Sequence, residues 1–265
     1  MIQPSAAPPS RPARLRELLR FVGQRILWSH SPFAREIIQA PGSWRCLDHI
    51  YRNAPSTWLD RRLLTLAACQ GTLERLHAYR RLLGDAVEVI HEEPIRLLDL
   101  GSGPGWAPLD LVASSPRTIA VTCVDRAADA IEAGRALADR RGLAHAVSFQ
   151  RDNIRRFAAE APAAAFHVVG THGVLDYFTG DDARVLLAAI GRLLVPGGVL
   201  VTSNMCHHRD RIARFLMEFF GGWRLHYRDE HAVAHLLEAA GYGEIETRIT
   251  AAGFHLLATG RRPTW

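Results

Sequence analysis

From residue 95 onward, short apolar runs of strand character alternate with longer segments of helical periodicity. The runs are "IRLLDLG", "TIAVTCVD", "AVSFQRD", "AFHVVGTH" and "VLVTSNM". Strands that are almost continuously apolar are buried on both faces, as in a parallel sheet covered by helices on each side. Two closing runs, "EIETRIT" and "GFHLLATG", are expected to form an antiparallel pair. The pattern therefore predicts an α/β fold with a doubly wound sheet.

Residues 1–90 show a different pattern: their apolar residues are mostly at helical spacing, and no strand pattern appears. We expect a helical N-terminal cap or lid over residues 1–90 and a ligand-binding sheet domain over residues 91–265. The cap segment contains 13 arginines and seven acids, a net charge of +6, whereas the remainder has a net charge of −1. A solvated helical face explains this excess most simply, and attraction of an anionic substrate or partner is the alternative.

Composition narrows the classes of partner. All 32 basic residues are arginine, and no nucleic-acid-binding module is recognisable, so the pI of 9.4 does not indicate nucleic acid. The four cysteines form no CxxC pair and the first 30 residues lack an apolar signal core, so a cytoplasmic location is expected. No apolar run is long enough for stable membrane insertion. We expect a small-molecule substrate, and a homodimer is left open.

The stretch "LLDLGSGPGW" ends the first predicted strand in three glycines, Gly101, Gly103 and Gly105. Glycine permits positive φ and lets a ligand approach the backbone itself. Ligands of doubly wound sheets bind outside the carboxyl ends of the strands. Asp125 ends the second predicted strand, where a carboxylate can accept hydrogen bonds from both hydroxyls of a ribose. The pattern therefore indicates an adenosine-like ligand.

Two phosphate-binding alternatives fit the glycine loop poorly. A dinucleotide fingerprint has a third glycine that allows close helix–strand packing, and Trp106 occupies that position here. A Walker loop has a lysine and a serine or threonine after its glycines, and neither follows here. An adenosine cofactor without phosphates remains, held by backbone groups and carboxylates.

Four motifs in order, "LLDLGSGPG", Asp125, Asp152 in "FQRDN" and "PGGVLV", resemble class I S-adenosylmethionine (SAM)-dependent methyltransferases. The resemblance covers roughly residues 95–260. It implies a Rossmann-like, seven-stranded sheet with a reversed last strand, and SAM as cofactor. The cofactor-binding residues predicted on this basis are Asp99, Gly101, Ser102, Gly103, Gly105, Asp125, Arg126, Asp152, Asn153 and Thr171.

A narrower resemblance rests on "GVLDYF" at residues 173–178, "RFLMEFFGGWRLHYRDE" at residues 214–230, and Asn204. These are similar to stretches in proteins that make 3-hydroxypalmitic acid methyl ester, a bacterial signal. Val174, Leu175 and Ser102 depart from that pattern. The resemblance places the chain in bacterial small-molecule metabolism without fixing the substrate.

Methyl transfer requires alignment and exclusion of water, and a base only if the acceptor arrives protonated. The predicted catalytic residues are Tyr177, Asp176 and His172. Tyr177 would contact the sulfonium, Asp176 the cofactor's amino group or the substrate, and His172 would act as a base. The structural alternatives are core packing for Tyr177, a helix cap for Asp176 and a backbone-bonded loop histidine for His172.

Other polar residues after the fifth predicted strand are less informative. "MCHHRD" at residues 205–210 has no matching ligand pair elsewhere, so no metal site is expected. Arg214, Tyr227 and Arg228 would bind a substrate carboxylate or form structural ion pairs.

The favoured function is O-methylation of a carboxylate on a small or lipid-like acid. The alternatives are a SAM-consuming lyase that releases methylthioadenosine and a small cyclic amino acid, and a non-catalytic SAM-binding protein.

Overall fold

The computed structural model describes residues 11–206, 215, 217–219 and 222–264, and for residues 11–16, 18 and 19 it describes the backbone alone. The chain divides into two compact units, Met1–Leu66 with Asp210–Arg224, and Ala67–Arg209 with Leu225–Trp265. The division expected after residue 90 therefore falls after Leu66, because helix α5 (Ala67–Glu88) packs on the sheet. Whether the first unit acts as a lid stays a prediction.

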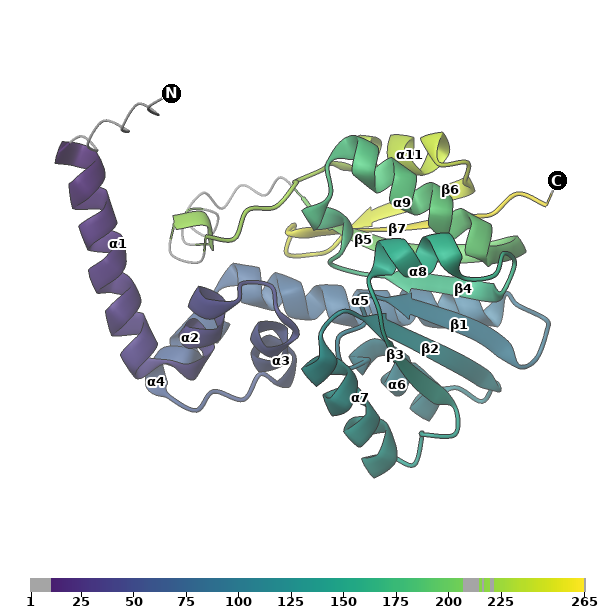
Figure 1. The fold of residues 1–265 in the computed structure, drawn as a ribbon, viewed down its shortest axis with the longest axis horizontal. Helices are drawn as coiled ribbons and strands as arrows, with labels where there is room; N and C mark the ends of the chain where they lie inside the picture. Colours follow the sequence, from purple (N-terminus) through teal and green to yellow (C-terminus); the bar gives the residue numbers. More distant parts are fainter. Residues whose placement is uncertain (1–10, 207–214, 216, 220–221, 265) are drawn as a thin grey trace, which may run out of the picture. The chain divides into compact units, whose positions relative to one another are not determined.

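The second unit is built on a seven-stranded sheet with the order β3-β2-β1-β4-β5-β7-β6 (Figure 1). Strands β1 to β5 run parallel, and β7 lies antiparallel to both of its neighbours, β5 and β6. The predicted seven-stranded topology with a reversed last strand is confirmed. The strands are β1 (Ile95–Leu100), β2 (Ile119–Asp125), β3 (Val147–Arg151), β4 (Phe166–Thr171), β5 (Leu194–Met205), β6 (Gly243–Ile249) and β7 (His255–Arg261).

Helices cover both faces of this sheet (Figure 1). One face carries α5, α6 (Trp106–Ser114) and α7 (Ala128–Arg140). The other carries α8 (Ile154–Glu160), α9 (Gly180–Leu193) and α11 (Glu230–Ala239). A short 3₁₀ turn, η1 (Leu175–Tyr177), follows β4.

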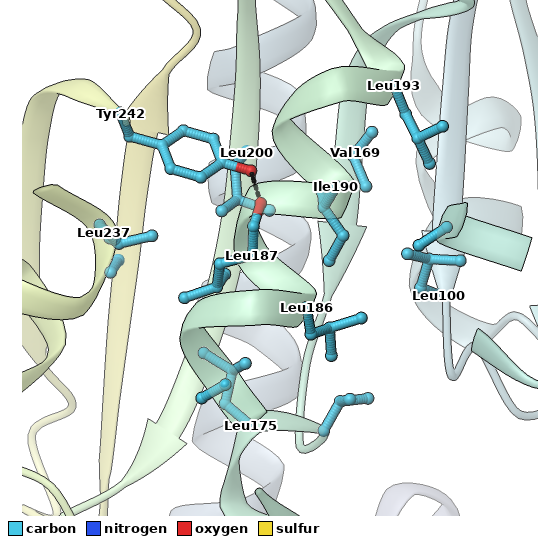
Figure 2. Close-up of a cluster of buried hydrophobic side chains, with 14 of the residues drawn as sticks. Leu100, Val169, Leu175, Leu186, Leu187, Ile190, Leu193, Leu200, Leu237 and Tyr242 are labelled. Carbon is cyan, nitrogen blue, oxygen red and sulfur yellow. Dashed lines mark hydrogen bonds between the residues drawn. The ribbon is translucent and has the colours of Figure 1, made fainter. Parts of the chain in front are cut away.

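The face under α9 and α11 holds a continuous apolar core, shown in Figure 2. Leucines of α9 pack on strand residues that point to the same side, including Val169 and Leu200. Tyr242 closes the end of this core and donates its hydroxyl hydrogen to the Leu187 carbonyl oxygen at 2.9 Å. Burying each leucine or isoleucine side chain stabilises the fold by roughly 1.5–3 kcal/mol. This core therefore holds in place the strands whose ends form the candidate site.

Helix α5 covers the opposite face with residues at helical spacing. Thr72, Leu76, Tyr79 and Leu83 are all buried and lie three or four positions apart. This spacing makes α5 a packed helix of the sheet unit, and it carries polar side chains into the interior.

The first unit contains α1 (Arg11–His30), α2 (Pro32–Gln39), α3 (Trp44–Arg52) and α4 (Trp58–Leu64). Asp60 joins two of these helices, because its carboxylate accepts hydrogen bonds from Ser31, the N-cap of α2, and from Ser56. Burial alone would raise the pKa of Asp60, but these hydrogen bonds outweigh it and hold the pKa below its usual value.

Across the described residues, no helix combines the length and apolarity needed to cross a bilayer. All four cysteines are buried as free thiols.

Candidate functional site

The glycine loop between β1 and α6 adopts backbone angles that favour glycine. Gly101, Gly103 and Gly105 have φ of 70°, 54° and 75°. A Cβ at Gly101 would lie 2.5 Å from Val174 Cγ2, and one at Gly105 would lie 3.2 Å from Cys123 Sγ. The glycines are therefore required both by conformation and by close packing.

Asp125 holds this loop at the carboxyl end of β2. Its Oδ2 accepts a hydrogen bond from the Gly103 N–H at 2.9 Å, and its Oδ1 accepts one from the Ala127 N–H at 2.9 Å. The structure therefore brings the predicted ribose-binding carboxylate to the glycine loop. Each oxygen keeps a lone pair that can accept a hydrogen bond from a ligand hydroxyl.

The next strand end supplies Asp152 beside Asp125, because the Asp152 N–H donates to the Asp125 carbonyl oxygen at 3.0 Å. Asp152 Oδ1 is paired with the Arg156 guanidinium at 2.6 Å. Asn153 has a structural task, since its side-chain oxygen caps the N-terminus of α8 by accepting from the Arg155 N–H at 2.9 Å. The contact of Asn153 with the cofactor stays a prediction. The side-chain oxygen of Asn153 already accepts the hydrogen bond that caps α8.

The remaining predicted cofactor residues differ in exposure. Arg126 is exposed at the end of β2. Ser102 is buried in the loop and donates to the Gly103 carbonyl oxygen at 3.1 Å. Thr171 is fully buried at the end of β4, and within the described part of the chain its hydroxyl has no hydrogen-bond partner. All three lie at the carboxyl edge of the sheet.

Asp99 lies in β1 just before the loop and is 1% exposed. A side chain of α5 forms a hydrogen bond with its carboxylate. Tyr79 donates its hydroxyl hydrogen to Asp99 Oδ1 at 2.6 Å. Gly170 makes room for this pair, because a Cβ there would lie 2.0 Å from the Tyr79 hydroxyl oxygen. Burial raises the pKa of Asp99 to about 7, the Tyr79 hydrogen bond opposes this, and the charge of Asp125 adds to it.

The second oxygen of Asp99, Oδ2, is buried and has no hydrogen-bond partner among the described residues. A buried acceptor of this kind is matched by a hydrogen-bond donor, and an amino-acid ammonium group is one such donor. The donor set fits SAM: the loop offers backbone groups, Asp125 would hold the ribose and Asp99 Oδ2 would accept from the amino-acid ammonium. When bound, this cofactor supplies an electrophilic methyl group.

His172 follows β4 and contacts Tyr79, with ring centroids 4.3 Å apart. Burial, and then the positive charge of Arg75, hold the pKa of His172 well below its ordinary value. Its Nδ1 has no hydrogen-bond partner in the described ranges, so the backbone-bonded alternative is not seen at that atom. His172 is therefore neutral and weakly basic at physiological pH.

Asp176, predicted to contact the cofactor or the substrate, makes contacts within the protein, and its predicted role stays a prediction. It is 2% exposed, and its Oδ1 accepts a hydrogen bond from the Met205 N–H at the end of β5. Arg75 Nη1 lies 4.0 Å from its other oxygen. Burial raises the pKa of Asp176, and Arg75 and the Met205 hydrogen bond oppose this. The helix-cap alternative for Asp176 is wrong, because Thr179 caps α9.

Arg228 is likewise committed to the loop after β4. Its Nη1 donates to the Leu175 carbonyl oxygen at 3.0 Å and to Asn204 Oδ1 at 2.7 Å, and its Nη2 donates to the Phe178 carbonyl oxygen. Arg228 as a whole residue is 8% exposed. The expectation that Arg228 binds a substrate carboxylate is therefore replaced by a structural role, since its donors hold η1 in place.

Tyr177 is 48% exposed at the end of η1, in contrast to its buried neighbours Leu175 and Asp176. Its predicted place beside the reacting methyl group stays a prediction. Arg214 and the histidines of "MCHHRD" lie outside the described residues. Among those described, no group of three or more His, Cys, Asp or Glu residues could hold a metal ion.

Three residues of the site escaped the sequence prediction: Arg75, Tyr79 and Ser203. Arg75 and Tyr79 are four positions apart on α5, which was assigned to the cap. Ser203 Oγ accepts the Gly173 N–H at 2.9 Å and fixes the turn after β4. The sequence did show Arg75 and Tyr79 within the apolar stripe of a predicted helix. Such a pattern does not show which part of the protein these side chains contact.

A strand order 3-2-1-4-5-7-6, with a glycine loop after β1 and acids at the carboxyl ends of β1 and β2, defines a class I SAM-dependent methyltransferase fold. A family model described as "Putative methyltransferase" matches residues 40–262. The chain belongs to this family. The narrower resemblance to enzymes of 3-hydroxypalmitic acid methyl ester synthesis stays a prediction.

Known proteins agree at the level of the fold. A protein of Escherichia coli K12 named "Uncharacterized protein YnbC" is 23% identical over 232 residues, which are 82% of this chain and 39% of that protein. The chain therefore spans about two-fifths of this relative's length. A crystal structure of a possible exported protein from Bordetella parapertussis has a TM-score of 0.80 at 19% identity, covering 96% of this chain and 94% of the other.

A "putative sarcosine dimethylglycine methyltransferase" from Galdieria sulphuraria has a TM-score of 0.55 at 12% identity, covering 73% of this chain and 87% of the other. At these identities the likeness concerns the fold alone.

Proposed function

We propose that this chain transfers a methyl group from SAM to a carboxylate oxygen of a small or lipid-like acid. The observation that carries the proposal is the loop of three positive-φ glycines, with the Gly103 N–H bound by Asp125 at the ends of two adjacent strands. This loop lies beside a buried carboxylate, Asp99, that has an oxygen open to a cationic donor.

A carboxylate acceptor is supported by the weakness of the bases nearby. His172 has a pKa well below its ordinary value, and Asp176 is bound by the Met205 N–H. A base with a pKa far below the working pH gives little driving force for removing a proton from an amine or hydroxyl. An acid that is already ionised needs no such step.

We further propose that Tyr177 contacts the acceptor or the sulfonium, while Asp176 and Arg228 act as positioning residues for the loop that carries it. The reaction would take place in the cytoplasm, which is consistent with four free thiols.

The test uses SAM labelled on its methyl group and a panel of small and fatty carboxylic acids. We expect label in a product that mild base hydrolyses to labelled methanol. At saturating SAM, where the titration of Asp99 no longer limits binding, the rate should be almost flat between about pH 6 and 8, since the acceptor is ionised and His172 is not titrating. Label found only in methylthioadenosine would instead identify a SAM-consuming lyase, and SAM binding without any turnover would identify a non-catalytic binding protein.

A further inference from the structure

Strand β6 is the last strand in the order of the sheet, so one of its edges pairs with β7 and the other is open. No backbone hydrogen bond to this open edge is formed by the residues that the structure describes. An open edge is a row of N–H and C=O groups that can pair with another strand. The sequence of Gly243–Ile249 therefore decides which partner strand the edge accepts.

The register of β6 on β7 shows which backbone groups point to the open edge. In an antiparallel pair, residues that exchange hydrogen bonds with the partner strand alternate with residues whose N–H and C=O groups point away from it. The Thr250 N–H donates to the His255 carbonyl oxygen at 2.8 Å, and the pairing continues without a shift back to Glu246. The even-numbered residues of this stretch therefore face β7, and Thr247 and Ile249 direct their backbone groups outward.

A register shift limits the regular part of the edge to residues 245–249. The shift lies between Gly243 and Glu246, and Glu244 has a φ of 47° there. Such a bulge twists a strand and ends its regular pairing. A partner strand can therefore use only this short segment, whose side chains must supply the specificity.

Two opposite charges flank the centre of the segment on one face of the sheet. Glu246 and Arg248 are both exposed and lie on either side of Thr247. In the described part of the chain, neither side chain forms a hydrogen bond or an ion pair. The residues opposite them on β7, Thr259 and Leu257, are uncharged. Both charges can therefore pair with side chains of a strand that joins the open edge.

The other face of the segment carries two isoleucines. Ile245 packs against the apolar core under α9 and α11. Ile249 lies on the same face, opposite Leu256 of β7, and is 42% exposed. Thr247 lies between the two isoleucines. The segment is therefore symmetric about Thr247, except that the two residues next to this threonine have opposite charges.

This pattern is self-complementary in one antiparallel register. A two-fold axis at Thr247 places Glu246 of each copy opposite Arg248 of the partner subunit. The same register places Ile245 opposite the partner's Ile249. Its central hydrogen bonds are those of Thr247, whose backbone groups point outward. An axis at Glu246 or at Arg248 would instead place two like charges opposite each other, which is unfavourable.

We propose that β6 is an interface between two copies of this chain, paired antiparallel about Thr247 so that their sheets join into one. The contact is closed, because each copy has one β6 edge and the pairing uses both. The proposal is independent of the proposed methyl transfer, since it uses no residue of the glycine loop or of the strand ends beside that loop. Because the segment is short, the dimer should form reversibly and depend on concentration.

The test is sedimentation velocity of the full chain over about 1–300 µM, where we expect a monomer–dimer equilibrium. Glu246→Arg places arginines opposite each other, and Arg248→Glu places acids opposite each other. Each variant alone should therefore dimerise at least about tenfold more weakly. Glu132→Arg, on the exposed side of α7, is the matched control and should dimerise as the unaltered chain does. A chain that stays monomeric over this range would overturn the proposal.

Mixing the two charge variants distinguishes this interface from any other. Chains with Glu246→Arg and chains with Arg248→Glu again place opposite charges across the axis, so mixed dimers should form with about the affinity of the unaltered chain. The double variant with both substitutions should dimerise on its own. Single variants that stay monomeric when mixed, or that dimerise alone as well as the unaltered chain, would overturn the proposal.

A backbone variant tests the pairing independently of charge. Thr247→Pro removes the central outward N–H and leaves the hydrogen bonds to β7 in place, as proline is tolerated at such positions of an edge strand. Dimerisation of this variant should be lost. A Thr247→Pro chain that folds and still dimerises would overturn the proposal, and if this variant does not fold, the charge variants decide.

Discussion

The hydroxyl of Tyr79 donates a 2.6 Å hydrogen bond to Asp99 Oδ1 and so joins helix α5 to the end of the first strand. The bond leaves Asp99 Oδ2 buried and unpartnered among the described residues, immediately before the glycine loop. A residue from the segment read as a cap thus orients a carboxylate of the first motif. If Asp99 binds the ammonium group of the cofactor as proposed, the protonation of Asp99 would control the affinity.

Affinity for S-adenosylhomocysteine should rise as the pH increases from about 6 to 8. The pKa of Asp99 lies at about 7, and a ligand ammonium binds the ionised carboxylate more strongly than the neutral acid. Calorimetry over this range measures the effect. Asp99→Asn should bind more weakly and lose most of the pH dependence. An unchanged slope in that variant would show that another group titrates.

The same pKa predicts how stability depends on pH. Because the folded-state pKa of Asp99 is above the unfolded value of about 3.9, its protonated form stabilises the folded chain at low pH. That contribution is lost as the pH rises from about 4 to 7. Tyr79→Phe removes a hydrogen bond of about 1 kcal/mol to the ionised form, which should raise the pKa by somewhat less than one unit. Urea unfolding at several pH values, compared with Asp99→Asn, measures both effects.

Asp125→Ala should weaken SAM binding by roughly tenfold or more, about 1.5–3 kcal/mol. The substitution removes the predicted acceptor of the ribose hydroxyls and also releases the Gly103 N–H from its 2.9 Å hydrogen bond. Asp139→Ala on the exposed side of α7 serves as the control and should leave affinity unchanged. Tight binding of NAD by the unaltered chain would contradict the choice of cofactor.

Tyr177→Ala should reduce kcat more than it reduces SAM affinity, by about tenfold against about twofold, if the ring contacts the reacting centre. Tyr177 is 48% exposed, so the variant should fold normally. Tyr177→Phe keeps the aromatic face and should retain most of the activity. Equal losses of kcat in both variants would point to the hydroxyl group instead.

Asp176→Ala should destabilise the sheet unit by about 2 kcal/mol or more, because it leaves the buried Met205 N–H without its acceptor and removes the carboxylate that lies 4.0 Å from the buried guanidinium of Arg75. Denaturant unfolding measures the change. Asp181→Ala, in the exposed first turn of α9, is the control and should change stability by about 0.5 kcal/mol or less. A variant of normal stability that lost only turnover would restore Asp176 to a catalytic role.

Several features of the fold follow from local patterns. The apolar runs, the helical spacing between them and the closing antiparallel pair were readable because burial on one or both faces imposes a period on the sequence. Asp99, the three glycines, Asp125 and Asp152 were found for a related reason. Each lies at the end of a predicted strand, and the carboxyl ends of parallel strands meet at one edge.

The local sequence pattern did not predict how exposed a single side chain is or which groups it forms hydrogen bonds with. Asp176 and Tyr177 are neighbours in sequence, yet one is 2% exposed and the other 48%. Arg228 was read as a candidate for substrate binding, whereas three acceptors around it hold its guanidinium in a structural network. These outcomes depend on contacts between residues that are 24 to 53 positions apart in the sequence, and a local periodicity of apolar residues carries no information about such contacts.

By itself, the sequence determined the order of strands and helices and the residues at the strand ends, because both depend on periodicity and on glycine's conformational freedom. Only the tertiary structure decided that α5 belongs to the sheet unit and that Tyr79 binds Asp99. The physical reason is that the sequence of an amphipathic helix indicates which of its positions are buried, but not which other part of the protein covers them. That part is chosen by the packing of the whole chain.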